Sequence, residues 1–237
     1  MSPVWLVLGT LTILPVPAPR SVDRRSAGWA MTLAPLVGLL LAVVPTAFLV
    51  LDGDPLLVAV LAVGVLAVLT RGLHLDGLAD TADGLGSGRR ADQALAIMKR
   101  SDIGPFGVAT LVLAILVQVS AIAALDDPWA VGAAIVVSRA VLPLVCVRWF
   151  SAARPEGLGA TVAGSVAWWQ AAIALGVAGL VCWVAGAPYS LIGLLAGLAL
   201  AWHCRRRFGG MTGDVYGACV EITLAAALLA ELCLRAL

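Results

Sequence analysis

Three aspartates lie close together in the stretch HLDGLADTADG, which covers residues 74–84. Asp76, Asp80 and Asp83 are spaced at i, i+4 and i+7, so on a continuous helix their side chains project within a sector of about 60°. Like charges at this spacing repel one another, and a divalent cation held between them would remove the repulsion. Ligand sets made only of oxygen suit Mg²⁺ or Mn²⁺ better than zinc. The spacing therefore predicts a magnesium site, with a solvated helix end as the alternative interpretation.

His74 precedes the aspartates and is a second candidate for a general base. On a continuous helix it points roughly 160° away from Asp76. We therefore expect a packed histidine and assign the role of base to an aspartate that the metal does not fully occupy. A helix break at Gly72 or Gly77 would reopen this question. The residues between the aspartates are small and leave room for a bulky diphosphate.

A basic, hydroxyl-bearing patch follows in the stretch IMKRSDIGPFG, residues 97–107. Lys99, Arg100 and Ser101 come just before a helix that we expect to begin near Gly104–Pro105, since proline is well tolerated in a first helical turn. A helix N-terminus next to cations suits a phosphate group. An ordinary cationic anchor at the membrane surface is the alternative interpretation.

The stretch RRRFGGMTGDVYGACVE, residues 205–221, repeats this combination of basic, glycine, hydroxyl and carboxylate residues. Arg205 and Thr212 are candidates for binding substrate, and Asp214 is a candidate fourth catalytic carboxylate. Glu221 lies seven residues after Asp214, about two turns inside an apolar segment. Charged residues inside a membrane are costly and usually functional.

Arg139, in the stretch VVSRAVLP, is a second charged residue in the middle of an apolar segment. Two interpretations remain open for it and for Glu221. The two side chains neutralise one another structurally, or Arg139 binds a substrate phosphate and Glu221 helps to hold a metal.

The composition indicates what must position these residues. Of the 237 residues, 62% are hydrophobic and 12% are charged, and the mean hydropathy is +1.03. A soluble protein is about half apolar and a quarter charged, so we predict an all-α, polytopic transmembrane helical bundle that forms a single domain over residues 1–237. The apolar residues 1–16 lack a basic start and end in prolines, which favours a short membrane-associated half-helix over a cleaved signal peptide. The five cysteines are scattered singly, as packing residues are.

Seven apolar segments approach or exceed the roughly 20 residues that cross a bilayer. They cover residues 30–51, 55–73, 104–125, 128–150, 165–185, 187–204 and 215–236. Three short connections, 52–54, 126–127 and 186–189, contain no Lys or Arg. Alternating seven spans places the basic residues Arg20, Arg24, Arg25, Arg89, Arg90, Lys99, Arg100, Arg148, Arg154, Arg205, Arg206 and Arg207 on one side, which the positive-inside rule identifies as cytoplasmic. The longer connections 72–103, 151–164 and 205–214 therefore face the cytoplasm.

Four motifs, GLHLDGLADTADG, IMKRSDIG, ARPEGLGA and GGMTGDVYGACVE, occur in this order. Together with the LTILPVP start and PLVGLLLA, they resemble the membrane-embedded cobalamin synthase family, the adenosylcobinamide-GDP ribazoletransferases. The resemblance covers essentially the whole chain. It implies that the chain joins adenosylcobinamide-GDP to α-ribazole, or to its 5′-phosphate, releases GMP and requires Mg²⁺. This reaction belongs to nucleotide-loop assembly in vitamin B12 biosynthesis.

The chemistry that the resemblance implies agrees with the residues. We expect the ribazole 5′-oxygen to attack the cobinamide-side phosphorus with GMP as the leaving group, a reaction that needs mainly positioning and charge neutralisation. Asp76, Asp80 and Asp83 are the expected metal ligands, and Asp214 joins them as a catalytic carboxylate. The expected substrate-binding residues are Lys99, Arg100, Ser101, Arg139, Arg205, Thr212 and Glu221.

The chain departs from the family pattern at two places. The family usually has an arginine where this chain has Ile13, and it commonly reads Asp-Ser-Arg where this chain reads Arg100-Ser101-Asp102. The swapped order is consistent with an acid–base pair whose members trade places, and it weakens the case for either residue as a catalytic group.

The resemblance also sets expectations for location and partners. We expect a multi-pass protein of a bacterial or archaeal cytoplasmic membrane, in contact with lipid, with its active-site loops in the cytoplasm and no nucleic-acid partner. Small-residue spacings occur in many of the apolar segments, so they leave homo-oligomerisation open.

Three other functions share parts of the pattern. A CDP-alcohol phosphotransferase or an aspartate-rich prenyltransferase would also use clustered aspartates, but the full signature of neither is present. A transporter would place Asp76, Arg139 and Glu221 along a pathway. The concentration of charge in the connections, rather than at the membrane midplane, argues against transport.

Overall fold

The computed structural model describes residues 2–17, 22–51 and 53–235, so Arg20 lies outside the described residues. The described part is helical, and beyond its helices it contains two isolated β-bridges, between Val147 and Val166 and between Ala152 and Met211. The helices are α1 Pro3–Leu11, α2 Arg24–Thr32, α3 Ala34–Leu49, α4 Pro55–Leu69, α5 Leu73–Gly86, α6 Ala91–Ile97, α7 Pro105–Leu125, α8 Pro128–Val145, α9 Leu158–Val162, α10 Trp168–Val184, the 3₁₀ helix η1 Pro188–Ile192, α11 Gly193–Phe208 and α12 Gly213–Arg235. The all-α prediction is confirmed.

By length and composition alone, the described helices supply three to five candidate membrane spans, against the seven predicted. Among the described helices, α7, α8 and α12 are each long and apolar enough to cross a membrane. The pairs α2–α3 and α4–α5 bring the number to five if each bent pair counts as one span. α10, with 17 residues, is a shorter apolar helix, and α11 ends in three arginines.

Several helices begin where the sequence supplies a cap and a proline. The Asp54 carboxylate accepts a hydrogen bond from the backbone N–H of Leu57, and Pro55 opens α4. The Asp127 carboxylate accepts from the N–H groups of Trp129 and Ala130 at the start of α8. Such side chains satisfy backbone donors that a helix start leaves unpaired, so these helix starts follow from local sequence.

The second predicted span, residues 55–73, is followed by a sharp bend at Gly72, one of the two possible helix breaks, because the chain turns by 89° between α4 and α5. Arg71 and Gly72 at the bend both have positive φ, +57° and +65°. Glycine adopts this conformation easily and arginine does not. The Arg71 guanidinium donates to the carbonyl of Gly9 at 3.0 Å, which ties the bend to α1. The aspartates therefore lie on a separate helix, α5, that turns away from the axis of α4.

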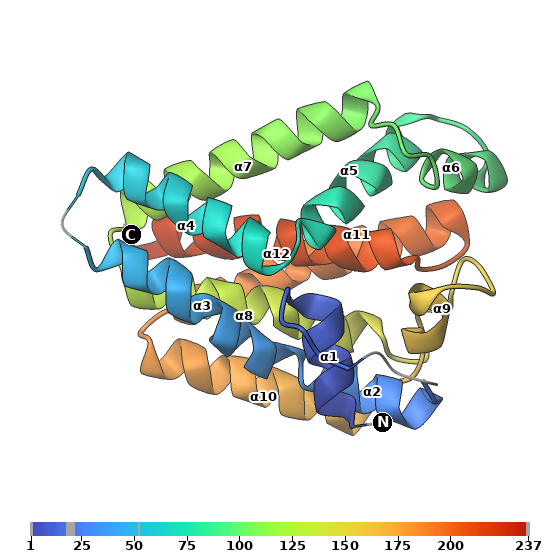
Figure 1. Cartoon of the computed structure of the whole chain (residues 1–237), viewed down its shortest axis with the longest axis horizontal. Helices are drawn as coiled ribbons and strands as arrows, with labels where there is room; N and C mark the ends of the chain where they lie inside the picture. The colour runs from blue at the N-terminus through green and yellow to red at the C-terminus, as the bar shows by residue number, and fades with distance from the viewer. Residues whose placement is uncertain (1, 18–21, 52, 236–237) are drawn as a thin grey trace.

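The connections gather at two opposite ends of the bundle, as Figure 1 shows. The short turns after α3, α7 and α10 lie at the left, together with the C-terminal end of α12. The aspartate-rich α5, the helices α6 and α9, and the connection from α11 to α12 lie at the right. The longer, polar connections therefore share one end, as the sequence predicted.

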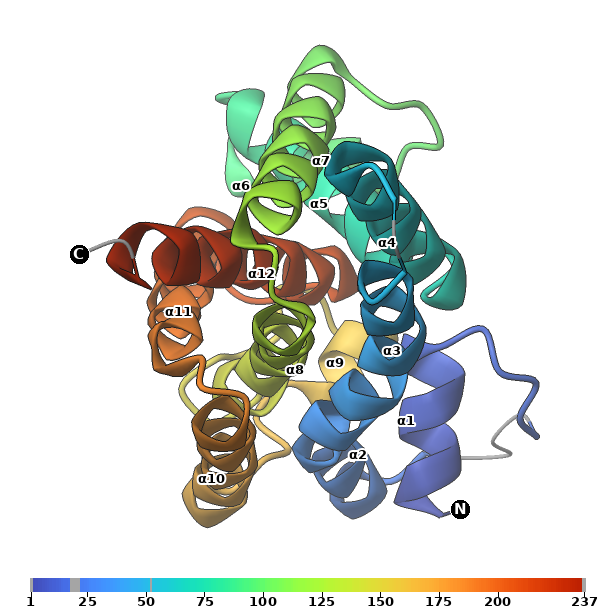
Figure 2. The ribbon, with the colours of Figure 1, turned by 90° about the vertical axis from the view of Figure 1, so that its left-hand side faces the viewer.

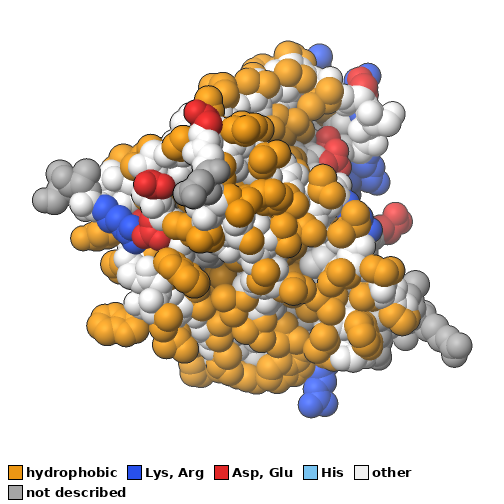
Figure 3. All heavy atoms as spheres, turned by 60° about the vertical axis from the view of Figure 1, so that its left-hand side comes forward, with side chains coloured by type: hydrophobic (Ala, Val, Ile, Leu, Met, Phe, Trp, Pro, Cys, Tyr) orange, Lys and Arg blue, Asp and Glu red, His pale blue; other side chains and the backbone are white. Residues whose placement is uncertain are grey.

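Helix α8 lies at the centre of the bundle, between α3, α10, α11 and α12 (Figure 2). Most of its side chains are buried, including the fully buried Arg139. The outer surface is largely apolar. Figure 3 shows one face that is covered mainly by hydrophobic side chains, with charged groups in small clusters toward its two sides. Such a surface suits contact with lipid.

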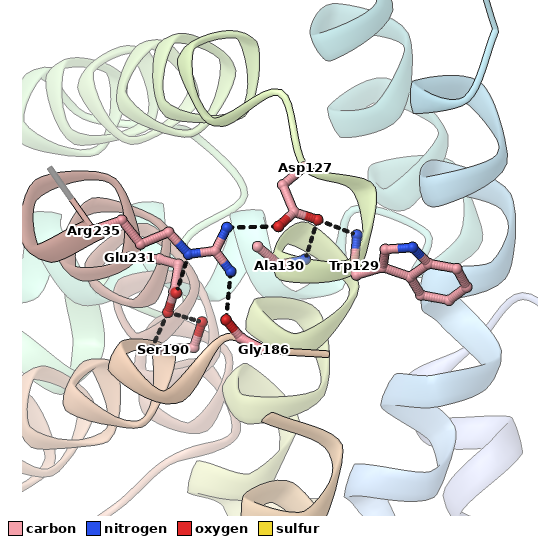
Figure 4. A network of polar contacts seen from close by, with 7 residues as sticks. All are labelled: Asp127, Trp129, Ala130, Gly186, Ser190, Glu231 and Arg235. Atoms are coloured by element: carbon pink, nitrogen blue, oxygen red, sulfur yellow. Dashed lines mark hydrogen bonds and ion pairs between the residues drawn. The ribbon is translucent and has the colours of Figure 1, made fainter. Parts of the chain in front are cut away.

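A polar network closes the end of the bundle that carries the short turns (Figure 4). The Arg235 guanidinium donates to the Asp127 carboxylate at 2.5 Å, to the Glu231 carboxylate at 2.6 Å and to the carbonyl of Gly186 at 2.7 Å. The fully buried Glu231 also accepts from the backbone N–H of Ser190. The network joins α12 to the α7–α8 turn and to η1, so Glu231 and Arg235 have a structural role at the bundle end.

Candidate active site

Helices α5 and α12 cross with their backbones in contact, and glycines make this possible. A Cβ built on Gly77 would lie 2.6 Å from the carbonyl oxygen of Asp214, and one built on Gly217 would lie 3.1 Å from the Cα of His74. Only residues without a side chain allow such close approach. The crossing brings the first turn of α12, with Asp214, against the aspartate-bearing helix.

Asp80 is the residue around which the charges of the site gather. Asp214, Asp76 and Asp83 all act electrostatically on its carboxylate, and Arg154 is the cation that acts on it. Arg154 also acts on Asp214. Asp76 is exposed, whereas Asp80 and Asp214 are half-buried. The sequence prediction that Asp214 joins the aspartates of α5 is supported by this arrangement.

Asp83 lies on the same helix but has different partners. Its two carboxylate oxygens accept hydrogen bonds from the backbone N–H groups of Gly104, at 2.7 Å, and Gly107, at 2.9 Å. A Cβ on either glycine would lie 2.5 Å from an Asp83 oxygen. Asp83 is buried and satisfies the free donors at the N-terminus of α7. In this arrangement Asp83 fixes α7 against α5.

The remaining carboxylates fit a metal ion that arrives with its substrate. Among residues 2–17, 22–51 and 53–235, no group of three or more His, Cys, Asp or Glu side chains is arranged to hold a metal ion. Mg²⁺ commonly binds through one or two carboxylates together with substrate phosphates, and it keeps several waters. The oxygen-only side chains of Asp76, Asp80 and Asp214 fit this mode of binding better than a complete protein cage.

Two long connections and the α6 segment meet beside the aspartates. The guanidinium of Arg154 donates to the carbonyl of Leu95, and that of Arg207 donates to the carbonyl of Arg89. The backbone N–H of Met211 donates to Ser151 at 2.8 Å, and that of Ala153 donates to Met211 at 2.9 Å. The connections that carry Arg154 and Arg207 therefore contact each other and the residues around α6, and Arg154 acts electrostatically on Asp80 and Asp214.

Thr212 caps the helix that carries Asp214. Its hydroxyl accepts from the backbone N–H of Val215 and donates to the Asp214 carboxylate, both at 3.2 Å. Helix α9 packs directly on this helix start, since a Cβ on Gly159 would lie 2.7 Å from the nitrogen of Gly213. A polar cleft of about 160 Å³ lies here, lined by Arg154, Glu156, Gly157, Gly159, Ala160, Met211, Thr212, Gly213 and Asp214.

The predicted basic patch lies on the surface. Lys99, Arg100 and Ser101 are all exposed. The guanidinium of Arg100 pairs with the carboxylate of Asp102 at 3.0 Å, in agreement with the expected acid–base pair. The guanidinium of Arg205, at the C-terminal end of α11, lies 5.1 Å from the ring centre of Trp202.

Arg139 and Glu221 lie inside the helix bundle. Glu221 accepts a hydrogen bond from the amide of Gln118 at 2.8 Å, and Arg139 donates to the hydroxyl of Ser138 at 2.6 Å. The two charged groups also act electrostatically on each other. The Nε and Nη2 atoms of Arg139 have no hydrogen-bond partner among the described residues, so both interpretations of this pair stand.

Two residues with important contacts were not expected from the sequence: Arg154, beside the aspartates, and Gln118, beside Glu221 inside the bundle. Arg154 was grouped only with the basic residues, although it stands in the ARPEGLGA motif next to a glycine-rich turn. Gln118 supplies the hydrogen bond to Glu221, and its signal is a polar side chain in the middle of an otherwise apolar segment.

Comparison with known proteins identifies the family. The family model described as cobalamin-5-phosphate synthase matches residues 3–232. An adenosylcobinamide-GDP ribazoletransferase of Nocardioides sp. is 44% identical over 236 residues, covering 97% of this chain and 98% of that protein. Its counterpart in Frankia casuarinae is 41% identical, covering 92% and 90%. The one in Shigella dysenteriae serotype 1 is 36% identical, covering 92% and 94%.

No solved structure matches the chain. The sequence matches extend over all four motifs, over the helices that carry Asp80 and Asp214, and over the connection that carries Arg154. These matches favour the cobalamin synthase interpretation over the two alternatives considered from the sequence, a transporter and a different diphosphate-dependent transferase. The chain therefore belongs to the cobalamin-5-phosphate synthase family.

Proposed function

We propose that this protein is an adenosylcobinamide-GDP ribazoletransferase that works at the crossing of α5 and α12. It joins adenosylcobinamide-GDP to α-ribazole, or to its 5′-phosphate, and forms adenosylcobalamin, or its 5′-phosphate, with GMP. One structural observation carries the proposal: Asp80 and Asp214 interact electrostatically, and Arg154 is the cation that acts on both. The relatives named above match the chain over almost its whole length.

The reaction exchanges one phosphorus–oxygen bond for another. A free ribose hydroxyl of ribazole attacks the cobinamide-side phosphorus of the diphosphate, the bond from that phosphorus to the bridging oxygen breaks, and GMP leaves with that oxygen. The 5′-oxygen expected from the sequence is not the nucleophile, because in the 5′-phosphate substrate it already carries a phosphate that the product keeps. The hydroxyl proton passes to a carboxylate. Bound Mg²⁺ would neutralise charge on the phosphoryl oxygens.

We assign different roles in the reaction to the four carboxylates. We assign Asp80 and Asp214 to the metal, because Asp214 is the strongest charge acting on Asp80 and both are half-buried. Asp76 borders the apolar cavity described below and is our choice for the base. Asp83 contributes by holding the start of α7, since its oxygens are already hydrogen-bonded.

The cations around the site bind the phosphates. Arg154 and Thr212 line the polar cleft next to Asp214, where a diphosphate would lie beside the metal. Lys99, Arg100 and Ser101 are exposed and are available for the guanosine half of the substrate. Arg205 is assigned a more distant role in attracting the anionic substrate.

We also propose a single domain with seven crossings of the bacterial cytoplasmic membrane. The spans would be the three long helices, the bent pair α2–α3, α4 up to the bend before α5, α10, and η1 with α11. The end that carries α5, α6, α9 and the α11–α12 connection holds most of the basic residues, which places it in the cytoplasm.

A direct assay tests the function. Membranes that contain the protein, supplied with adenosylcobinamide-GDP, α-ribazole and Mg²⁺, should form adenosylcobalamin and GMP in equal amounts. Membranes from the same cells without the protein are the control. Folded protein that yields neither product would refute the proposal.

A further inference from the structure

An apolar cavity of about 210 Å³ lies beside the proposed catalytic carboxylates. It is lined by Thr10, Leu11, Met31, Leu73, His74, Asp76, Leu142, Gly159, Val162, Gly213, Asp214, Tyr216 and Gly217. The cavity shares Gly159, Gly213 and Asp214 with the polar cleft around Arg154. A group bound in the cavity would therefore lie next to a phosphate bound in the cleft.

His74 is a buried polar residue of this lining that lacks a hydrogen-bond partner. It is 3% exposed, and neither ring nitrogen has a hydrogen-bond partner among the described residues. The hydroxyl of Tyr216 is a second buried polar group of the lining without a hydrogen-bond partner among the described residues, whereas the hydroxyl of Thr10 donates to the carbonyl of Leu6. A buried polar group without a partner is unfavourable unless a ligand satisfies it.

The size and polarity of the cavity indicate which part of the two substrates could bind in it. Its volume corresponds to about seven water molecules, which suits a fused bicyclic base and is far too small for a corrinoid ring. Guanine carries several donors and acceptors, and most would be left unpaired in an apolar lining. A benzimidazole nucleoside has apolar ring edges and one free ring nitrogen, which can accept a hydrogen bond from the unpartnered imidazole of His74.

We propose that this cavity binds the benzimidazole base of ribazole and that a ring nitrogen of His74 donates a hydrogen bond to the free nitrogen of that base. This inference rests on the proposed function and names the acceptor subsite of the same reaction. The base would lie between His74 and Val162, while the ribose would reach the mouth of the cavity, where Asp76 and Asp214 stand. His74 is then a residue for substrate selection and not the general base.

The inference is tested by equilibrium binding of α-ribazole to the detergent-purified full chain, without Mg²⁺ and without adenosylcobinamide-GDP. The uncharged nucleoside should bind under these conditions. His74→Phe keeps a planar ring but removes both nitrogens, so ribazole should bind about tenfold more weakly. His74→Gln, which can still donate, should retain most of the affinity. His203→Phe changes the other, exposed histidine, on α11, and should bind as the wild type does.

An analogue identifies the atom involved. The ribonucleoside of a dimethylindole lacks the free ring nitrogen, so the wild type should bind it about tenfold more weakly than ribazole. The His74→Phe variant should bind the two nucleosides equally, as a double-mutant cycle requires for direct contact. Equal loss for both nucleosides in His74→Phe, or unchanged ribazole binding, would overturn the inference.

Folding is separated from binding by two further measurements. Removing an unpartnered buried polar group does not sacrifice a hydrogen bond, so the His74→Phe variant should melt at or above the wild-type temperature.

Val162→Phe should fill the cavity from α9 and weaken ribazole binding while the KM for adenosylcobinamide-GDP stays unchanged. Unaltered ribazole binding in Val162→Phe would place the base elsewhere. A wild type that binds ribazole but never releases GMP would refute the proposed function and leave the subsite standing.

Discussion

At the scale of single residues, the three aspartates of α5 differ in what their carboxylates touch. Asp83 accepts two backbone N–H groups, whereas Asp80 faces other carboxylates and Arg154. The sequence could show that the three share a helical sector, because that follows from spacing alone. It could not show that Gly104 and Gly107 approach Asp83, because that contact joins residues 21 and 24 positions apart.

Asp83→Asn separates the two roles of this residue. The amide would turn a donor toward one of the two glycine N–H groups, and a buried donor left unpaired costs about 1–3 kcal/mol. The melting temperature should fall, while the Mg²⁺ concentration that gives half-maximal GMP release should not change. Asp92→Asn, on the exposed face of α6, is the matched control and should alter neither quantity. A raised Mg²⁺ requirement at unchanged stability would instead make Asp83 a metal ligand.

At the scale of elements, the site depends on the contact between α5 and α12. Many of the helices follow from apolar segments and from caps such as Asp54–Pro55 and Asp127–Pro128, which are local signals. The 89° bend at Arg71–Gly72 follows only in part. Gly72 marks a possible helix break in the sequence, but an arginine rarely adopts positive φ, so the conformation of Arg71 is not a local signal. The bend is set by tertiary contacts, including the one from Arg71 to α1.

Gly77→Ala tests the contact between the two helices. The new methyl group would lie 2.6 Å from the Asp214 carbonyl oxygen, so one helix must shift, at about 1–3 kcal/mol. Both stability and GMP release should fall. Gly64→Ala, on α4, meets nothing within 4 Å and should be neutral or stabilise the fold by up to about 1 kcal/mol. Thermal melting of the two variants in the same detergent distinguishes them, and equal stability would show that the α5–α12 contact is not tight.

At the scale of the whole molecule, the two ends of the bundle have separate roles. The end that carries α5 and α9 holds the reactive carboxylates, whereas the opposite end is closed by the network around Arg235 (Figure 4). The division into two ends could be predicted from the distribution of Lys and Arg. The network could not, because it joins Asp127, Gly186 and Glu231 from distant parts of the sequence.

Arg235→Gln should destabilise the fold without changing the chemistry. The substitution would leave the fully buried Glu231 without its cation. Breaking an ion pair in a fully buried site costs about 3–5 kcal/mol. The cost should be smaller here, because Arg235 is partly exposed. The melting temperature should fall, while the KM values of the remaining folded protein stay unchanged. Asp126→Asn, next to Asp127 and exposed, is the control. Wild-type stability of Arg235→Gln would show that the network contributes little.

The same network predicts a dependence on pH. Burial alone would raise the pKa of the Asp127 carboxyl, but the hydrogen bonds from Arg235, Ala130 and Trp129 outweigh it and lower that pKa. A carboxyl with a lowered folded-state pKa stabilises the fold above its unfolded value of about 3.9, and this stability is lost as pH falls through the folded value. The Asp127→Asn variant should therefore be less stable than the wild type at pH 7, and the difference should shrink below about pH 4. A difference that grows on acidification would contradict this sign.

The assignment of Asp80 to the metal is the central claim, and a Mg²⁺ titration of GMP release tests it most directly. Asp80→Asn removes one negative charge from the carboxylates that would hold the cation, so at saturating substrates kcat should fall by at least about a hundredfold. The protein should still insert, melt cooperatively and bind α-ribazole, and Asp92→Asn should behave as the wild type does. Near-normal kcat with an unchanged Mg²⁺ requirement in Asp80→Asn would contradict the account.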